Sequence, residues 1–419
     1  MKTQRVAVLA HSHPALTKGG GEIVAHRSFR HLQQVCDHAT LFTAVPLRVR
    51  SGNSIFSRDE RIVEYDSEEF LLQSDRYDDF LGTTDDWKLL DDIASICDKR
   101  KINVFHFHHF FQLGVNAAAY LRSRFPHAAF VLTLHEFLSI CYQHGQMIRR
   151  NSRLRCNRAS PIDCHLCFPE HSKEEFRLRS SLFEHFFASF QAITAPSRFL
   201  AEMIKDAGLV NDILLVQNGT SCSAPENVDH GCPIDLHARF AFFGQTTPYK
   251  GLDVYLTAAV RILEKLGSIA TFSIYGCDIA GALRLPAIQS LASSLNKWSG
   301  NIVFRGVYDP QSVISHMQTC GWVVVPSVWW ENSPIVIQEA FAAGRPVLCS
   351  GIGGMREAVE HGRDGFYFRP DDPLDLSNTF ERCLAGPQTW SNLRANIKAP
   401  RTIEIMNAEY VKIYSDILG

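Results

Sequence analysis

The stretch WWENSPIVIQEAFAAGRP, Trp329–Pro346, carries the clearest helix start and stop signals in the chain. Ser333 is a favourable N-cap, Pro334 suits the first helical position, and Gly344 is typical of the residue just past a helix end. The apolar run Trp322–Val325 lies just upstream and predicts a buried strand. The sequence therefore predicts a helix that begins at the carboxyl end of a parallel strand, where open α/β sheets bind their ligands.

Two carboxylates flank this predicted helix start, with Glu331 before it and Glu339 about two turns in. The free backbone amides of Ile335, Val336 and Ile337 are expected to point out of the helix and to form an anion site. Carboxylates accept hydrogen bonds from hydroxyls, so a central diphosphate with a hydroxyl-rich group on each side suits the pattern. A nucleotide sugar has this shape. The alternative is an ordinary helix with two solvated glutamates.

Short apolar runs alternate with helical patterns along the rest of the chain, which predicts an α/β protein with parallel sheets. A length of 419 residues favours two domains of about 200 residues each. The first-half runs are Val6–Ala10, Ala39–Thr43, Ile102–Phe107, Ala129–Leu134, Ala192–Ala195 and Ile213–Val216, and the second-half runs are Phe240–Phe243, Thr271–Tyr275, Ile302–Arg305, Trp322–Val325 and Pro346–Cys349.

The pattern of runs pauses at residues 217–235, which are rich in Gly, Ser, Asn and Pro and predict a linker. The expected domains are residues 1–225 and residues 226–396, each a Rossmann-like unit. The remaining residues, 397–419, include a helical pattern that follows a second domain already complete. We expect this helix to pack back on the first domain.

The composition indicates a water-soluble protein and gives no electrostatic reason to expect nucleic acid as a partner. The formal net charge is −2, charged residues make up 21% of the chain, and hydrophobic residues make up 46%. The N-terminal apolar run is too short for a signal peptide, and no apolar stretch approaches 20 residues. We therefore expect a cytoplasmic protein whose twelve cysteines form no disulfide framework.

The spacing Glu-x7-Glu, followed by Ala-x3-Gly-x-Pro-Val, resembles the signature of family 4 of the retaining glycosyltransferases. The segment GIGGMREAVEHGRDGFYF, Gly351–Phe368, extends this resemblance. It implies the GT-B fold, in which two Rossmann-like domains face each other across a cleft. It also implies sugar transfer with retention of configuration and without a catalytic metal, with Glu331 on the donor sugar and Glu339 on the ribose. The leaving diphosphate is then expected to help deprotonate the acceptor.

The resemblance extends to other parts of the donor site. Lys250, in FGQTTPYKG, matches a lysine that neutralises the diphosphate, whereas Gln245 stands where the family usually has arginine. A solvated surface lysine is the alternative for Lys250. The strand-end segments SIYGC and FRGVY match the nucleotide-binding region, but they do not tell UDP, GDP and ADP apart, and the expected donor is a UDP- or GDP-sugar. The expected donor-binding residues are Gly20, Gly21, Gly244, Gln245, Lys250, Gly276, Arg305, Glu331, Asn332, Ser333, Ile335, Val336 and Glu339.

The first domain is expected to bind the acceptor. Gly20 and Gly21 follow the first strand, precede a predicted helix and allow close approach of the backbone to a ligand. His135 ends a strand in LTLHEF and matches a family histidine near the reacting sugar, although a lone histidine is usually structural. His108 and His109 are weaker candidates. The expected catalytic residues are His135, Glu331 and Lys250.

Four cysteines lie within 27 residues, at Cys141, Cys156, Cys164 and Cys167, and end in a CxxC pair. In a cytosolic chain this spacing predicts a structural metal, with zinc first and an iron–sulfur cluster second. Four free or occasionally oxidised cysteines are the alternative. The cluster would hold a long loop, 141–167, that contains little apolar sequence. Five arginines in the same loop suit either a solvated face or anionic lipid headgroups at the inner membrane surface.

The sequence therefore predicts a glycosyltransferase that uses a nucleotide-sugar donor and a glycan or lipid-linked acceptor, in polysaccharide or glycoconjugate biosynthesis. No cofactor is expected for catalysis. Two alternatives remain open: a nucleotide-sugar epimerase on the same two-domain plan, and an inactive nucleotide-sugar-binding module whose cysteine loop docks a partner protein. The Glu-x7-Glu match argues against the epimerase.

Overall fold

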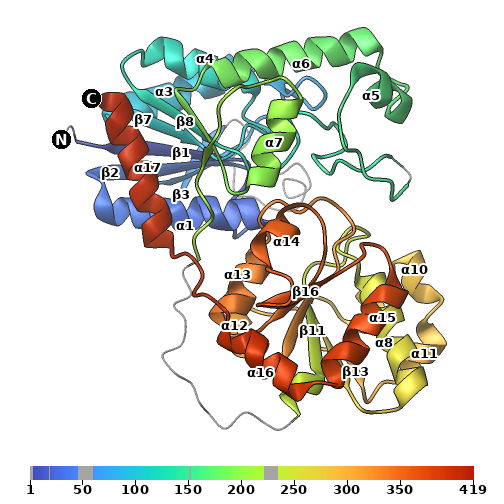
Figure 1. Ribbon diagram of the computed structural model, residues 1–419. Helices are drawn as coiled ribbons and strands as arrows, with labels where there is room; N and C mark the ends of the chain where they lie inside the picture. The colour runs from blue at the N-terminus through green and yellow to red at the C-terminus, as the bar shows by residue number, and fades with distance from the viewer. Residues whose placement is uncertain (1–2, 18, 46–59, 151, 221–234) are drawn as a thin grey trace. The chain divides into compact units, whose positions relative to one another are not determined.

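The computed structural model describes residues 3–17, 19–45, 60–150, 152–220 and 235–419. The chain divides into two compact units, Met1–Gly219 with Ile403–Gly419, and Thr220–Thr402 (Figure 1). The predicted boundary at residues 225/226 and most of the predicted linker, 217–235, lie outside the described residues. No helix among the described residues is long and apolar enough to cross a membrane.

The first unit is built on an eight-stranded sheet in the order β10-β9-β8-β7-β1-β2-β4-β3, in which only the β3–β4 pairing is antiparallel. A small hairpin, β5–β6, lies outside this sheet. The strands are β1 Arg5–Ala10, β2 His38–Ala44, β3 Ile62–Asp66, β4 Glu69–Leu72, β5 Tyr77–Asp78, β6 Thr83–Thr84, β7 Val104–Phe107, β8 Ala129–Thr133, β9 Ala192–Ala195 and β10 Leu214–Leu215. The helices are α1 Gly20–Val35, α3 Trp87–Lys99, α4 Val115–Arg124, α5 Pro161–Cys167, α6 Lys173–Ala188, α7 Arg198–Asp206 and α17 Ile403–Leu418.

The second unit is built on a six-stranded parallel sheet in the order β13-β12-β11-β14-β15-β16. The strands are β11 Arg239–Phe243, β12 Thr271–Tyr275, β13 Ile302–Phe304, β14 Trp322–Val325, β15 Val347–Ser350 and β16 Gly365–Phe368. The helices are η1 Leu236–Ala238, α8 Leu252–Leu266, α9 Ile279–Ala282, α10 Pro286–Gln289, α11 Ala292–Lys297, η2 Pro310–Ser312, α12 Val313–Met317, α13 Ile335–Ala342, α14 Gly353–Ala358, α15 Pro373–Leu384 and α16 Pro387–Ala395.

The predicted α/β class with two parallel sheets is confirmed. The apolar strand runs are buried on both sheet faces, as continuous apolar sequence requires. In the second unit, Phe240 stacks against Phe272 and Trp322 on the two neighbouring strands. Buried rings of this size anchor the register of the central strands, and so fix where their carboxyl ends lie.

Helix α17 follows the whole second unit in sequence but belongs to the first. It packs against α1 and β8, and buried polar contacts tie it down. Tyr414 Oη lies 2.6 Å from His106 Nδ1, and Ser28 Oγ donates to Asn407 Oδ1 at 2.5 Å. These contacts join α17 to β7 and α1. The first unit is therefore built from residues that precede the second unit in sequence and from residues that follow it.

Candidate functional site

Three glycines shape the carboxyl ends of β11, β12 and β13. The Gly244 amide donates to the Tyr275 carbonyl at 3.1 Å, and the Gly276 amide donates to the Gly306 carbonyl at 2.8 Å. Gly276 has a φ of 114°, and a Cβ placed there would lie 2.0 Å from the Gly244 carbonyl oxygen. Only glycine tolerates both conditions. The predicted pair Gly244 and Gly276 therefore lies together at this edge of the sheet.

Lys250 and Glu331 meet at the ends of the adjacent strands β11 and β14. The Lys250 Nζ lies 2.7 Å from Glu331 Oε1. Gly251, with a φ of 70°, turns the chain into α8, and a Cβ there would lie 1.9 Å from the Pro326 carbonyl oxygen. Lys250 and Glu331 also line a pocket with about 220 Å³ of empty space, together with Phe242, Phe243, Val324, Val325, Pro326, Ser327 and Val336. Two predicted catalytic residues, 81 positions apart, thus share one pocket.

Glu331 is held rigidly through one of its two carboxylate oxygens. Oε1 accepts hydrogen bonds from Lys250 Nζ, from Ser327 Oγ at 2.8 Å and from Trp329 Nε1 at 2.8 Å. Among the described residues, no donor contacts Oε2. Burial raises the pKa of Glu331, but the Lys250 charge and these hydrogen bonds outweigh it and lower the pKa below its usual value. The result is an ionised, oriented carboxylate with one oxygen left for a ligand hydroxyl.

Helix α13 begins one residue later than the sequence predicts. Pro334 has an extended backbone (ψ 116°) and is itself the N-cap, so Ser333 does not cap the helix. The Ile337 amide donates to the Pro334 carbonyl at 3.0 Å, and it is therefore not one of the free amides. Ile335 and Val336 remain as the amides at the helix N-terminus. This corrects the predicted role of Ser333 and the predicted set of three amides.

The other end of α13 is as the sequence predicts. Gly344 is left-handed, with a φ of 66°, and its amide donates to Phe341 at 3.0 Å. The Arg345 amide reaches back to Ala340 at 2.8 Å, which completes a Schellman-type stop. Pro346 precedes β15 and lies outside it, because β15 begins at Val347.

Glu339 is the fifth residue of α13, so it lies just over one turn in and not two. Burial first, and then the nearby Glu339 charge, raise the pKa of Tyr308 to about 12. Tyr308 lies edge-on to Phe243 and Tyr275, whose rings stack at 4.5 Å. Glu339 therefore lies near the aromatic residues at the ends of β11 and β12.

Gly354 supports the Glu331 loop, and the sequence did not predict this role. Its amide donates to the Glu331 carbonyl at 2.7 Å, and a Cβ at this position would lie 1.6 Å from the Asn332 carbonyl oxygen. The Gly-Gly pair that opens α14 could have been the signal, since paired glycines often mark close backbone approach. Gln245 and Arg305 lie on exposed loops after β11 and β13.

In the first unit, His135 lies after β8 and is next to the first turn of α1. A Cβ at Gly21 would lie 3.5 Å from the His135 Cβ and Cγ atoms, and His108 Nδ1 lies 3.0 Å from His135 Nε2. Gly20 and Gly21 are inside the first turn of α1 and do not precede it, because Gly19 is the N-cap. Burial, followed by the neighbouring His109 and His11, lowers the pKa of His135 to about 3. His135 is therefore neutral at neutral pH.

Sequence reasoning missed His11 at this edge of the sheet and offered His109 only as a weaker candidate. His11 Nε2 lies 3.2 Å from Glu22 Oε1, and His109 Nε2 lies 3.2 Å from Glu136 Oε1. His11 follows β1 and His109 follows β7, two neighbouring strands. Their position after predicted strands was a usable signal, since parallel strands end at one edge of the sheet.

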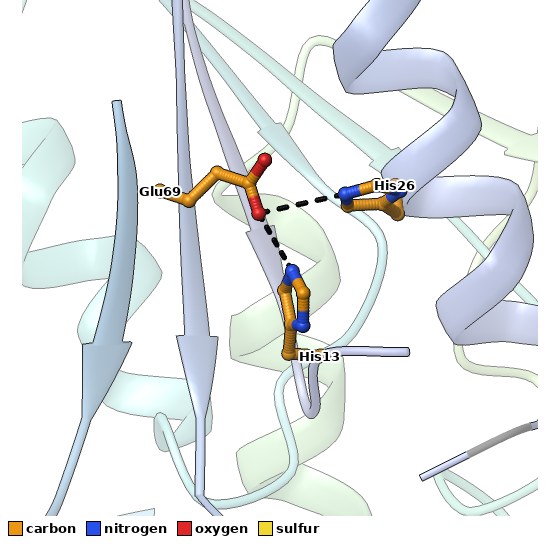
Figure 2. A group of neighbouring side chains, drawn as sticks. All are labelled: His13, His26 and Glu69. Atoms are coloured by element: carbon orange, nitrogen blue, oxygen red, sulfur yellow. Dashed lines mark hydrogen bonds and ion pairs between the residues drawn. The ribbon is translucent and has the colours of Figure 1, made fainter. Parts of the chain in front are cut away.

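Figure 2 shows His13, His26 and Glu69, the only group of three or more potential metal ligands within 4.8 Å of one another among the described residues. The Ala15 amide donates to His13 Nδ1 at 3.1 Å, so the proton is on Nε2, which points at Glu69 Oε2 at 2.6 Å. Metal binding would need the Nε2 lone pair, and Arg30 already pairs with Glu69. The group is therefore a hydrogen-bonded anchor and a poor metal site.

The predicted metal ligands Cys141, Cys156, Cys164 and Cys167 line one pocket. None of the four forms a disulfide, and no three of the four sulfurs lie within 4.8 Å of one another. The pocket lies in the first unit, in the segment that follows His135.

Two family models match the chain. One, described as Glycosyltransferase Family 4, matches residues 18–223, and one described as Glycosyl transferases group 1 matches residues 237–386. The chain is 30% identical over 158 residues to a D-inositol 3-phosphate glycosyltransferase from Frankia alni, and 31% identical over 144 residues to an uncharacterized glycosyltransferase from Methanocaldococcus jannaschii. These matches cover 37% and 34% of this chain, and 38% and 35% of those proteins.

Solved structures show the fold over nearly the whole chain. HepE of Anabaena, in complex with UDP, has a TM-score of 0.67 at 16% identity and covers 99% of this chain and 100% of that one. Sucrose-phosphate synthase from Thermosynechococcus elongatus has a TM-score of 0.70 at 17% identity and covers 99% of both chains. The predicted GT-B fold is confirmed.

Proposed function

Since the chain belongs to the family 4 glycosyltransferases with the GT-B fold, we propose that it transfers a sugar from a nucleotide-sugar donor to a hydroxyl of an acceptor. We assign it to the biosynthesis of a glycan or glycoconjugate, with retention of anomeric configuration and no catalytic metal. The observation that carries the proposal is the Glu331 carboxylate, which is fixed through one oxygen beside Lys250 and the N-terminus of α13.

The donor site follows from the charges at this edge. The leaving diphosphate takes the free amides of Ile335 and Val336 and the Lys250 ammonium, which together supply positive charge where negative charge develops. Glu331 Oε2 accepts a hydrogen bond from a hydroxyl of the transferred sugar, and Glu339 accepts one from the ribose. Lys250 thus serves both its anionic neighbour and the leaving group, which reduces the need for a divalent cation.

The acceptor is assigned to the first unit, whose strand ends carry His135. As a neutral imidazole, His135 can accept or donate one hydrogen bond to a sugar hydroxyl without adding charge. His108 Nδ1 lies 3.0 Å from His135 Nε2, which orients the His135 ring. A polysaccharide and a lipid-linked oligosaccharide both remain open as acceptors.

A thermal-shift panel of UDP, GDP, ADP and their glucose conjugates tests the donor site. HepE has been solved with UDP and with UDP-glucose, so a UDP-sugar is the first donor to try. Binding should raise the melting temperature through ligand linkage. If no nucleotide shifts the melting temperature, and Glu331→Gln behaves like the wild type, the donor-site proposal is wrong.

An inactive binding module is the second candidate, because Gln245 replaces the arginine that the resemblance implies. Gln245→Arg restores a charge near the diphosphate and should strengthen binding of UDP in either case. A large gain in sugar transfer from an undetectable baseline would support the inactive module. A wild type that already transfers sugar, with little gain in the variant, would support the enzyme.

A further inference from the structure

We propose that Cys141, Cys156, Cys164 and Cys167 form a four-thiolate metal centre, with zinc as the expected ion, that holds the segment after β8 in the first unit. Three separate pieces of chain bring the cysteines to one pocket. Cys141 lies in the turn that follows Phe137, and Cys156 ends a short hairpin. Cys164 and Cys167 lie three residues apart on α5. An i,i+3 pair on a helix presents both side chains to the same side.

The hairpin that delivers Cys156 is built by backbone bonds. The Cys156 amide donates to the Met147 carbonyl at 2.7 Å, and the Arg149 amide donates to the Leu154 carbonyl at 2.9 Å. Met147 and the two residues His144 and Gly145 all have positive φ, between 48° and 68°. Two of these are not glycine, and a left-handed backbone at such residues is held in place only by its surroundings. The backbone between Cys141 and the hairpin is therefore held in one conformation by the residues packed around it.

Each sulfur already faces a hydrogen-bond donor. The backbone amides of Met147 and Gln143 reach the Cys141 sulfur, and the Arg150 amide donates to Cys167 Sγ at 3.0 Å. Ser160 backbone reaches Cys164, and the Arg149 side chain reaches Cys156. Neutral thiols are weak acceptors, whereas metal-bound thiolates are anionic and are regularly stabilised by such donors. Donors in these positions would stabilise the four sulfurs once a metal ion has bound them.

A buried cation without a carboxylate partner is the second, independent observation. Arg179 is only 4% exposed and donates to the carbonyl oxygens of Ser139 and Leu138 at 3.2 and 2.6 Å. Its Nε has no partner, and no carboxylate lies within ion-pair distance among the described residues. The groups whose negative charge would stabilise it are Tyr77, Cys141, Glu136 and Cys164, and none of them forms an ion pair with it. A zinc ion with four thiolates carries a net charge of about −2, which would satisfy a buried guanidinium.

The segment also lacks an apolar core of its own. Helix α5 buries none of its residues, and its nearest apolar cluster is small, consisting of Phe80, Phe168 and Phe176 with both helix cysteines against it. Leu154, Ile162 and Leu166 are exposed. Segments of this kind usually rely on a cross-link or a metal for stability.

Binding needs only a local rearrangement. Zinc–sulfur bonds of about 2.3 Å place four sulfurs about 4 Å apart, closer than the arrangement described above. The four cysteines are half-buried, so the ion can reach them. Each thiol loses one proton to solvent as its sulfur bonds the ion, which makes binding dependent on pH.

Elemental analysis of the full chain, purified without chelator and under reducing, anaerobic conditions, tests the proposal. We expect about one zinc per chain and a thiolate-to-metal absorption band after replacement by cobalt. Cys164→Ser and Cys167→Ser should each lose most of the metal. Cys36→Ser, a half-buried cysteine in the same unit but outside the pocket, is the matched control and should keep it. Iron with equimolar sulfide in place of zinc would support the four-thiolate centre and assign it as a cluster.

Limited trypsin digestion gives a readout that does not depend on the variants folding. Trypsin cleaves after arginine, and the segment contains Arg149, Arg150, Arg153, Arg155 and Arg158. The rate of cleavage there therefore reports whether the segment is ordered. Removing the metal from the wild type should speed cleavage at these residues at least tenfold, and adding zinc alone should reverse the effect. A metal-free protein whose cleavage rate is unchanged by zinc would overturn the proposal.

Discussion

At the residue scale, the Lys250–Glu331 pair explains how a buried carboxylate remains charged. Without the ammonium, burial alone would raise the Glu331 pKa, since desolvation is the largest single influence on it. The pair also explains why one oxygen of Glu331 is taken while the other is left open. We expect a ligand that brings an anionic group to Lys250 and a hydroxyl to the second oxygen of Glu331.

Lys250→Met should therefore weaken UDP-sugar binding and lower the transfer rate by about 100-fold, the usual cost of one group that stabilises a leaving charge. Isothermal titration and a transfer assay measure the two effects. Lys265→Met is the control, because Lys265 pairs with Glu381 on an exposed surface of the same unit. Equal losses in both variants would contradict a specific role for Lys250.

Gly354→Ala should displace the Glu331 loop, because the new Cβ would lie against the Asn332 carbonyl oxygen. We expect a loss of at least about 2 kcal/mol in unfolding free energy, or a folded protein that no longer binds the donor. Denaturant melts and nucleotide titration distinguish these outcomes. At Gly300 a Cβ meets nothing within 4 Å, so Gly300→Ala should behave like the wild type.

At the element scale, the predicted strands located the Lys250–Glu331 pocket more accurately than the predicted helix caps did. The apolar runs before Lys250 and Glu331 predicted β11 and β14, and parallel pairing of these strands brings their carboxyl ends together. The Ser333 cap was wrong because Pro334 stays extended and delays the helix by one residue. A one-residue shift depends on a single ψ angle, which composition does not determine.

Other elements gave too weak a signal to predict. Strand β3, with the sequence IVEYD, is largely exposed and carries two acids, so it lacks a buried-strand pattern. The β5–β6 hairpin has two residues on each side. The Gly354 contact joins α14 to the Glu331 loop, and the His11–Glu22 pair joins the loop after β1 to the first turn of α1. Such contacts follow from the folded arrangement of strand ends, and spacing within one motif does not reveal them.

Tyr414→Phe tests the attachment of α17. The change removes the hydroxyl that lies 2.6 Å from His106 Nδ1 and leaves a buried ring nitrogen unpaired. We expect the first unit to lose about 1–3 kcal/mol of unfolding free energy, with no effect on the second. Hydrogen exchange followed by mass spectrometry resolves the two units. Lys412→Ala, an exposed position of the same helix, is the control and should change protection by little.

At the scale of the whole molecule, the buried histidines of the first unit predict a dependence of stability on pH. Burial lowers the pKa of His106 and of His135 to about 3, and lowers those of His108 and His109 well below 6.5. Between pH 3 and 6.5 the unfolded chain therefore binds more protons than the folded one. The histidine contribution is complete above pH 6.5 and is lost as the pH falls toward 3.

Glu136 acts in the opposite direction, since burial raises its pKa to about 7. Its folded form holds a proton that the unfolded chain releases above about pH 4.5, so its contribution falls as the pH rises to 7. Four histidines outweigh one glutamate, and the unfolding free energy should rise between pH 4.5 and 6.5. Urea melts at several pH values measure the slope. A flat or falling profile would show that these histidines are already protonated in the folded protein.

The membership of α17 in the first unit also sets an order for synthesis. Residues 403–418 leave the ribosome only after residues 220–402, which can form their own sheet and core meanwhile. Until α17 arrives, the first unit exposes the apolar and polar surfaces that Tyr410, Tyr414 and Met406 later cover. The second unit is thus expected to mature during translation while the first waits. A nascent chain stalled before residue 403 is the form most exposed to chaperones and proteases.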